Sequence, residues 1–378
     1  MNLTIDREIL LENLNTISRG LPSKSPLPIL TGIKLYVTEN DLFMTSSNSD
    51  ISVEVTINDA SLEIKEPGQT VVPGKFIDII RKINSRKVNL YLADDKILVI
   101  KADRGEYKLY VMDPLEYPKM DFVALENPLK LSSDLLKNII KSTVFATSQT
   151  EKKPILTGVN FSNVNKVLTI TATDSFRLSQ KVVNIDEYAD FNITIPSKSL
   201  DELSKAIDQY AGEVNLYFKA NKLLAQFRNV CFQTRLLDGN YPDTSKLIIP
   251  NYQINLTFNK DELIEALERV SLLSPRDSSK DKEITYSIVK LELKKDRTVE
   301  ISTNNSQIGD AKEELLPTGI EADGPISLGF SSRYLLDALK SFLSTEVVLS
   351  FQAETRPFIV RGENDGNLTQ LILPVRMN

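Results

Sequence analysis

The sequence predicts an α+β fold made of three tandem repeats, each with two helices packed on antiparallel strands. The motif PILTGIKL at residue 28 returns as PILTGVNF at residue 154, a spacing of 126 residues and one third of the 378-residue chain. Short alternating runs such as VNLYL (88–92) and VNLYF (214–218) lie between the helical patterns. We expect domains at 1–125, 126–250 and 251–378, each long enough for its own core.

In each repeat a strand is expected to run into the first helix. Asp6, Ser132 and Asn259 occupy equivalent positions, and their side-chain oxygens suit the N-cap because they accept hydrogen bonds from free helix amides. A carboxylate follows two residues later in every copy, where the helix dipole favours it. An apolar pair at i, i+4 completes the pattern of an amphipathic helix.

A second helix is predicted over 72–83, 195–207 and 330–342, and each copy carries two cations seven residues apart. At 100° per residue, seven steps return to within about 20° of the start, so the two cations share a face. The six are Lys75, Lys82, Lys198, Lys205, Arg333 and Lys340. One interpretation is a surface that faces a polyanion, hidden within a net charge of −6. The alternative is an ordinary solvated face, diluted by Asp78, Asp201, Glu202 and Asp337.

Composition excludes several kinds of chemistry. The chain has no histidine, which removes histidine-dependent nucleophilic catalysis and zinc sites with histidine ligands. Its one cysteine, Cys231, excludes an intrachain disulfide and is expected to be a packed small side chain. With no long apolar run and no signal-like N-terminus, we expect a cytoplasmic protein in a reducing compartment. We also predict that the protein uses no metal or other cofactor, although composition alone leaves carboxylate or metal chemistry possible.

A carboxylate or metal enzyme remains open as an alternative, because Asp50, Glu54 and Asp174 are available. Asp174, however, recurs in the same motif as Asn48 and Asn305 in the other repeats. Since an amide replaces the carboxylate there, a structural role in a turn is favoured over catalysis.

Size indicates how such repeats could surround DNA. A 126-residue domain has a radius of gyration of roughly 14 Å and a diameter of about 36 Å. Three of them in a closed ring leave a hole of about 6 Å, and six leave about 36 Å. A duplex is about 20 Å across, so one chain cannot encircle it whereas two can. The repeats therefore favour a head-to-tail homodimer closed by two-fold symmetry.

Five motifs carry a family resemblance: LPIL (27–30), VPGKF (72–76), TATDSFRL (171–178), LDGNYPD (237–243) and QLILPVRMN (370–378). Together they resemble the bacterial β sliding clamps, the processivity subunits of DNA polymerase III. The resemblance implies three clamp-type domains per chain, two chains forming a six-domain ring with helices inside, and no catalytic activity. It implies sliding on double-stranded DNA without reading sequence. The implied partners are the replicative polymerase, a clamp-loader ATPase, and repair and replication proteins with clamp-binding peptides.

The resemblance also implies a peptide-binding pocket between the second and third domains. Its residues would be Leu156, Thr173, Ser175, Phe176, Arg177, Leu178, Pro242, Lys246, Leu247, Leu371, Leu373, Pro374, Val375, Arg376 and Met377. Apolar walls would accept apolar side chains, while Thr173, Arg177 and Arg376 would orient the peptide backbone. Phe176 replaces a histidine often found in the family, and Lys246 replaces an arginine, which offers a point charge instead of a fork.

Candidate DNA contacts implied by position, beyond the six helix cations, are Lys24, Gln149, Lys152 and Lys153. The implied dimer interface sets Tyr107 and Leu109, on an edge strand, against Leu272 and Leu273 of the partner. A competing hypothesis is a monomeric three-domain scaffold that binds peptides and does not encircle DNA; a stable monomer in solution would favour it.

Overall fold

The computed structural model describes residues 1–124, 126–186, 188–219, 221–274 and 287–375. The chain separates into two compact units, each built from two segments. Unit 1 is Met1–Lys137 with Lys198–Leu236, and unit 2 is Asn138–Ser197 with Leu237–Asn378. The middle third of the chain is thus shared between them. The predicted domain boundaries at 125/126 and 250/251 stay a prediction.

Unit 1 contains two antiparallel sheets. The five-stranded sheet has the order β5-β1-β7-β8-β9 and the eight-stranded sheet the order β10-β15-β16-β17-β4-β3-β2-β6. Their strands are β1 (Asn2–Asp6), β2 (Gly32–Val37), β3 (Leu42–Ser47), β4 (Ile51–Ile57), β5 (Glu63–Glu66), β6 (Gly68–Pro73), β7 (Lys87–Asp94), β8 (Ile97–Ala102), β9 (Gly105–Tyr110), β10 (Leu129–Ser132), β15 (Glu213–Lys219), β16 (Lys222–Phe227) and β17 (Val230–Arg235). Strand β4 of the first repeat pairs with β17 of the second, for example Val53 with Phe232, so one sheet crosses the repeat boundary.

Unit 2 repeats this plan. The nine-stranded sheet has the order β14-β11-β12-β13-β26-β25-β24-β18-β22, and the four-stranded sheet the order β21-β20-β19-β23. Their strands are β11 (Gly158–Val164), β12 (Val167–Thr173), β13 (Arg177–Asn184), β14 (Phe191–Pro196), β18 (Ile254–Asn259), β19 (Ile288–Leu293), β20 (Val299–Asn305), β21 (Gly309–Leu315), β22 (Gly319–Ala322), β23 (Ile326–Ser331), β24 (Glu346–Phe351), β25 (Phe358–Gly362) and β26 (Leu368–Ile372). Here β13 of the second repeat pairs with β26 of the third, with Leu178 opposite Leu371.

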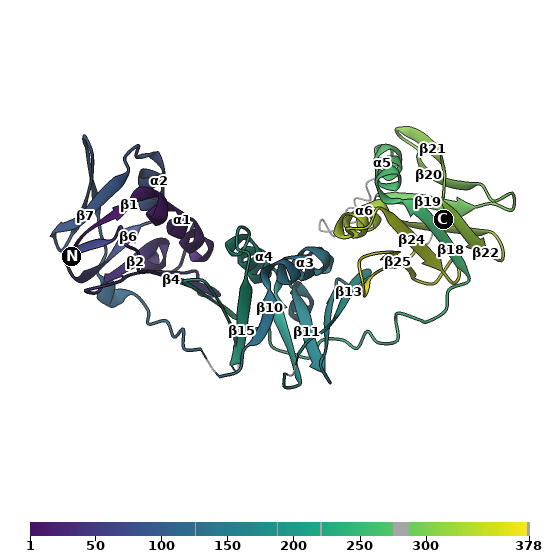
Figure 1. Ribbon diagram of the computed structural model, residues 1–378. Coiled ribbons are helices and arrows are strands. Elements are labelled where there is room, and N and C mark those ends of the chain that lie inside the picture. The colour runs from purple at the N-terminus through teal and green to yellow at the C-terminus, as the bar shows by residue number, and fades with distance from the viewer. Residues whose placement is uncertain (125, 187, 220, 275–286, 376–378) are drawn as a thin grey trace. The chain divides into compact units, whose positions relative to one another are not determined.

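Each repeat contributes two α-helices, as the sequence predicts. They are α1 (Arg7–Ile17) and α2 (Lys75–Lys82), α3 (Ser133–Thr143) and α4 (Ser197–Ala206), and α5 (Lys260–Ser271) and α6 (Ser332–Ser341). Helices α1 and α2 pack on each other in unit 1, as α5 and α6 do in unit 2 (Figure 1). The predicted α+β class and the two-helix repeats are therefore confirmed.

The predicted N-caps are also confirmed. The carboxylate of Asp6 accepts a hydrogen bond from the backbone N–H of Glu8 at 2.9 Å. Asn259 caps α5 in the same way through the N–H of Asp261 at 3.0 Å. The hydroxyl of Ser132 accepts from a backbone N–H of the first turn of α3 at 3.2 Å. Each cap satisfies an amide that would otherwise have no partner at the helix start.

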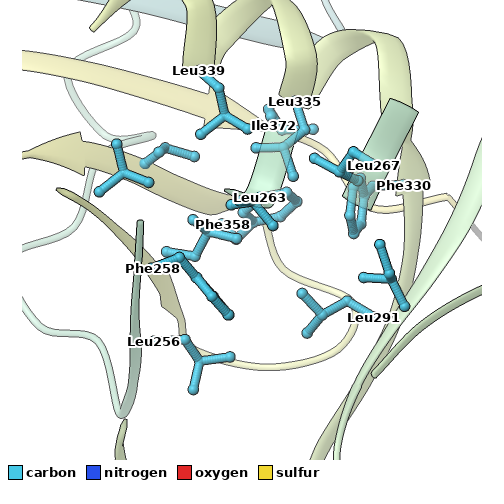
Figure 2. Close-up of a cluster of buried hydrophobic side chains, with 14 of the residues drawn as sticks. Leu256, Phe258, Leu263, Leu267, Leu291, Phe330, Leu335, Leu339, Phe358 and Ile372 are labelled. Atoms are coloured by element: carbon cyan, nitrogen blue, oxygen red, sulfur yellow. The ribbon is translucent and has the colours of Figure 1, made fainter. Parts of the chain in front are cut away.

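A large core lies in unit 2, where leucines of α5 and α6 pack with strand residues of both sheets (Figure 2). The helix leucines labelled there are Leu263, Leu267, Leu335 and Leu339. Phe358 is fully buried between Phe351, whose ring centroid is 5.1 Å away, and Phe330, at 5.3 Å. Truncating a buried leucine or phenylalanine in such a core costs about 2–5 kcal/mol of stability. This packing holds β25 and β26 in place, and β26 borders the candidate site.

Candidate functional site

The site begins at the tight turn that joins β12 to β13. The carboxylate Oδ1 of Asp174 accepts hydrogen bonds from the backbone N–H groups of Phe176 at 2.9 Å and Arg177 at 3.0 Å. Ser175, between Asp174 and Phe176, has a φ of 81°, in the left-handed region. The first repeat builds the same turn, with Asn48 as acceptor at 3.1 and 2.8 Å and a left-handed residue after it at φ 80°. Asp174 therefore serves the turn, as the repeat comparison predicts.

Arg177 holds this turn against three other parts of unit 2. Its Nε donates to Asp174 Oδ2 at 3.1 Å, its Nη1 to Asp337 Oδ2 at 2.6 Å and its Nη2 to the carbonyl oxygen of Phe145 at 2.5 Å. The guanidinium also lies 4.5 Å from the ring centroid of Tyr334. Only 8% of the arginine side chain is exposed. Every nitrogen of this guanidinium thus has a partner within the protein, and its expected role in orienting a bound peptide stays a prediction.

Burial and charge oppose each other at the Asp174 carboxyl. Burial raises the pKa of Asp174, and the neighbouring Arg177 guanidinium pulls that pKa back down. Thr173 is likewise committed to the turn, because its hydroxyl donates to the carbonyl oxygen of Arg177 at 2.6 Å. Side-chain hydrogen bonds from Thr173 and Asp174 thus hold the turn together.

The segment 237–247 covers the other side of the turn. The Tyr241 hydroxyl accepts a hydrogen bond from the backbone N–H of Thr173 at 3.0 Å. Burial raises the pKa of that hydroxyl well above its ordinary range. Beyond it, the N–H of Leu247 donates to the carbonyl oxygen of Thr244 at 3.0 Å, which makes a second turn. These contacts set Pro242 and Leu247 opposite the β12–β13 turn.

Between these elements lies an open cavity of about 450 Å³ within unit 2. Leu178 and Leu371 form its floor, and behind them they pack in an apolar cluster with Ile359, on three adjacent strands. The residues that line the cavity are Lys153, Ile155, Leu156, Thr173, Ser175, Arg177, Leu178, Pro242, Asp243, Thr244, Leu247, Leu371 and Leu373. Its walls are mostly apolar, with one lysine and one exposed carboxylate among them. Such a cavity can desolvate apolar side chains of a ligand.

The structure brings most of the predicted pocket residues together and leaves out others. Among the described residues, Phe176, Lys246, Pro374 and Val375 do not line the cavity. The Phe176 side chain is 41% exposed, and its carbonyl oxygen accepts from the N–H of Leu373 at 3.0 Å. The chain then turns away, because the N–H of Val375 donates to the carbonyl oxygen of Gly329 at 2.8 Å. The predicted Arg376 and Met377 lie outside the described residues.

Four lining residues were missed by the pocket prediction. Ile155, Asp243 and Thr244 adjoin predicted residues in the PILTG and NYPD motifs, so extending each motif by one or two positions would have found them. Lys153 was expected to contact DNA, and it lines this cavity.

The six helix cations are all exposed, as predicted, but three of them are ion-paired. Lys75 Nζ lies 3.0 Å from the Asp78 carboxylate, and Lys205 Nζ lies 2.7 Å from Glu202. Lys340 Nζ lies 2.9 Å from Glu268 on α5. Within the described residues, the cations without an ion-pair partner are Lys82, Lys198 and Arg333. The other DNA candidates, Lys24, Gln149, Lys152 and Lys153, are exposed.

Two of the predicted dimer residues lie on an edge strand of unit 1, and the other two follow a helix of unit 2. Strand β9, which carries Tyr107 and Leu109, is at the edge of the five-stranded sheet of unit 1. Leu272 is the C-cap residue directly after α5 in unit 2 and is 79% exposed, and Leu273 follows it half-buried. Beside α5, β21 is an edge of the four-stranded sheet. Open edges of this kind offer backbone groups for pairing with another strand.

The remaining catalytic candidates lie in unit 1, where Glu54 on β4 and Cys231 on β17 occupy directly paired positions across the sheet. Asp50 is exposed in unit 1, and Glu54 is half-buried on β4, where burial raises its pKa. Cys231 is half-buried on β17, and the amide of Gln226 donates to its sulfur at 3.5 Å. In the described part of the chain, three or more cysteine or carboxylate side chains nowhere gather as metal ligands would. Across those same residues, every helix is too short or too polar to cross a bilayer.

Three α+β repeats joined through continuous sheets, with an apolar cavity at the β13–β26 seam, have the architecture of DNA sliding clamps. Residues 1–121, 130–243 and 246–376 match the family models for the N-terminal, central and C-terminal domains of the DNA polymerase III beta subunit. The chain belongs to the DNA polymerase III beta subunit family.

Full-length relatives agree with this assignment. The chain is 37% identical to a beta sliding clamp of Staphylococcus epidermidis, covering 100% of this chain and 99% of the relative. It is 36% identical to the Bacillus subtilis beta sliding clamp over 100% of both chains. Among solved structures, the B. subtilis DNA polymerase sliding clamp superimposes with a TM-score of 0.93 over 100% of both chains. The beta subunit from Streptococcus pyogenes, 33% identical, gives 0.93 with the same coverage.

Proposed function

We propose that this chain is the processivity clamp of the replicative DNA polymerase. Two copies would close head to tail into a six-domain ring around duplex DNA, with helices inside. The observation that carries the proposal is the match of all three repeats, in order, to the domains of one family. The three domains would be 1–125, 126–250 and 251–378, and the ring would act in the cytoplasm, where bacterial chromosomes are replicated.

The unit 2 cavity is the proposed tether for partners. Its volume of about 450 Å³ lies in the range of ligand pockets and suits two or three apolar side chains of a short peptide. Asp243 and Lys153 at its margin would add polar contacts to the peptide, whereas Arg177 would shape the wall without binding it. Polymerase, clamp loader and repair proteins would then compete for one cavity in each chain.

DNA is proposed to contact the ring weakly. The cations free of ion pairs, Lys82, Lys198 and Arg333, would provide a diffuse field, and Lys24, Gln149 and Lys152 would add exposed contacts. Ion pairing lowers the contribution expected from Lys75, Lys205 and Lys340. A ring is retained by topology, so weak, salt-sensitive phosphate contacts let it slide.

Closure of the ring is proposed to use β9 of one chain against the α5 and β21 region of the other. Tyr107 and Leu109 would meet Leu272 and Leu273 of the second copy, and the two open edges would extend a sheet across the interface. Sedimentation equilibrium at micromolar concentration tests this, with twice the chain mass expected. A stable monomer would instead favour a peptide-binding scaffold that does not encircle DNA.

The tether is tested by titrating a fluorescent hexapeptide with a Leu-Phe pair, compared with its Ala-Ala counterpart. Leu247 lines the cavity and is 46% exposed, so Leu247→Ala removes apolar area without opening the core. We expect affinity to fall about three- to tenfold. The matched control is Leu343→Ala, an exposed leucine of unit 2 outside the cavity. Equal affinities for the Leu-Phe and Ala-Ala peptides would refute the tether.

A further inference from the structure

Two linkers follow the first and second repeats, residues 111–128 and 236–253. Both are anchored near their start by an equivalent backbone hydrogen bond. In unit 1 the backbone N–H of Met112 donates to the carbonyl oxygen of Val71 at 2.9 Å. In unit 2 the N–H of Leu237 donates to the carbonyl oxygen of Thr194 at 2.8 Å. Each side chain also packs on the glycine that follows PILT in its own unit. A Cβ added to Gly32 would lie 2.5 Å from the Met112 side chain, and one added to Gly158 would lie 2.7 Å from the Leu237 side chain.

The two linkers next place a tyrosine in the same way. Tyr117 and Tyr241 are each followed by proline. Tyr241 accepts from the N–H of Thr173 at 3.0 Å. Burial raises the pKa of the Tyr117 hydroxyl, and a hydrogen bond from the backbone of Ser47, the equivalent of Thr173, partly opposes that rise. The linkers therefore run over equivalent surfaces of two equivalent seams.

Three residues beyond each tyrosine the linkers differ. Unit 2 has Thr244, whose short side chain lines the open cavity. Unit 1 has Met120, which packs against the apolar cluster of Leu30 and Tyr117. Its sulfur also accepts a hydrogen bond from the hydroxyl of Ser52 at 3.5 Å. By the 126-residue spacing, Leu30 and Ser52, which Met120 meets, are equivalent to two lining residues of the cavity, Leu156 and Leu178.

We infer that unit 1 holds a second copy of the peptide cavity, and that Met120 of the chain's own linker is its built-in occupant. The long, adaptable thioether takes the place that an apolar ligand side chain would take in unit 2. A small cavity of about 140 Å³ lies near this site, because one of its lining residues, Gln233, pairs with Ser52 across the sheet. The residues that line it are Asp121, Val123, Tyr217, Lys219, Asn221, Lys222, Leu224 and Gln233.

Two further differences keep the occupied copy closed to partners. Ser52 and Gln233 in unit 1 stand where unit 2 has the apolar floor of Leu178 and Leu371. An ion pair between Lys219 Nζ and the Asp121 carboxylate, at 3.5 Å, adds an interaction that holds the linker over the seam. Each chain accordingly offers the open cavity of unit 2 to apolar peptides, while the copy in unit 1 is used internally.

The reciprocal exchange of the two linker residues tests the inference. Thr244→Met should fill the open cavity and weaken binding of the Leu-Phe hexapeptide at least about tenfold. Thr244→Val is the matched control, because its side chain has the same shape and leaves the cavity open. Equal weakening by methionine and valine would overturn the inference.

The peptide assay rests on the proposed function, because it assumes that peptides bind the unit 2 cavity. A second measurement, which uses no peptide, tests the inference independently. Crystals of the full chain with Met120→Thr, pressurised with xenon, should bind the gas between Leu30 and Ser52. Wild-type protein and the exposed linker control Lys119→Thr should not. Xenon at that position in wild type, or none in Met120→Thr, would refute the occupancy. If xenon binds as expected but no peptide binds unit 2, the tether fails and the occupied copy stands.

Discussion

Replacing Arg177 with methionine tests how unit 2 braces the turn beside its cavity. Methionine keeps much of the apolar stem and removes the guanidinium that joins Asp174, Asp337 and the carbonyl oxygen of Phe145. The exposed side-chain fractions are 8% for the arginine, 13% for Asp174 and 32% for Asp337. Losing one partner of a buried ion pair costs about 3–5 kcal/mol. Because Asp337 stays partly hydrated, we expect the lower end, about 3 kcal/mol.

Hydrogen–deuterium exchange measured by mass spectrometry can locate this destabilisation. A cost of about 3 kcal/mol corresponds to roughly 100-fold faster exchange through opening of unit 2. Peptides from unit 1, such as those of α1 and α2, should exchange as in wild type. Arg356→Met, at an exposed arginine of the same unit, is the control. If Arg177→Met speeds exchange no more than this control does, the guanidinium does not brace the turn.

Three further predictions concern charge and assembly. Burial raises the pKa of the Asp174 carboxyl in the folded state, so the folded state binds the proton more tightly than the unfolded state does. The free energy of unfolding should therefore fall as pH rises from the ordinary value of 3.8 to the raised folded-state pKa. Asp174→Asn should remove this pH dependence in acid denaturation yet keep the turn, as Asn48 does in the first repeat. Leu272→Asp should give a monomer by sedimentation with both units folded, because that side chain is 79% exposed; an intact dimer would contradict the proposed interface. Charge reversal at the cations without ion-pair partners should weaken DNA retention, and it should lower the slope of log affinity against log salt concentration by about 0.9 for each phosphate that is no longer neutralised. Reversal at the ion-paired cations should have a smaller effect. Equal effects would contradict the idea that ion pairing weakens a cation's contact with DNA. The three without partners in the described part of the chain are Lys82, Lys198 and Arg333, and the paired ones are Lys75, Lys205 and Lys340.

The features that sequence predicts well are local ones. The helix caps at Asp6, Ser132 and Asn259 form with amides two or three residues away, so a short motif contains all their partners. The turn at Asp174 is equally local, and its recurrence as Asn48 separates a structural role from catalysis. The three-repeat α+β class follows for the same reason, because each repeat carries its complete set of local signals.

Interactions between distant segments were not predictable in this way. The partner of Arg177 at Asp337 is 160 residues away, so a spacing argument does not reveal that every guanidinium nitrogen already has a partner within the protein. Lys340 likewise meets Glu268, 72 residues away on another helix. The pairing of Val375 with Gly329, which carries the chain away from the cavity, also depends on tertiary structure. The tyrosine lies five positions after the anchor in the first linker, from Met112 to Tyr117, and four positions after it in the second, from Leu237 to Tyr241. This offset of one residue hides the equivalence of Met120 and Thr244 until both tyrosines are seen in place.

Retention on DNA of defined topology tests the central claim most directly. The protein is loaded onto a singly nicked plasmid by the clamp loader, separated from free protein, and followed before and after a single restriction cut. A ring held by topology should stay on the circle at moderate salt and leave within the time of linearisation, by sliding off the ends. Equal retention on circular and linear DNA would contradict the account, because it would mean that direct binding to DNA, and not encirclement, holds the protein.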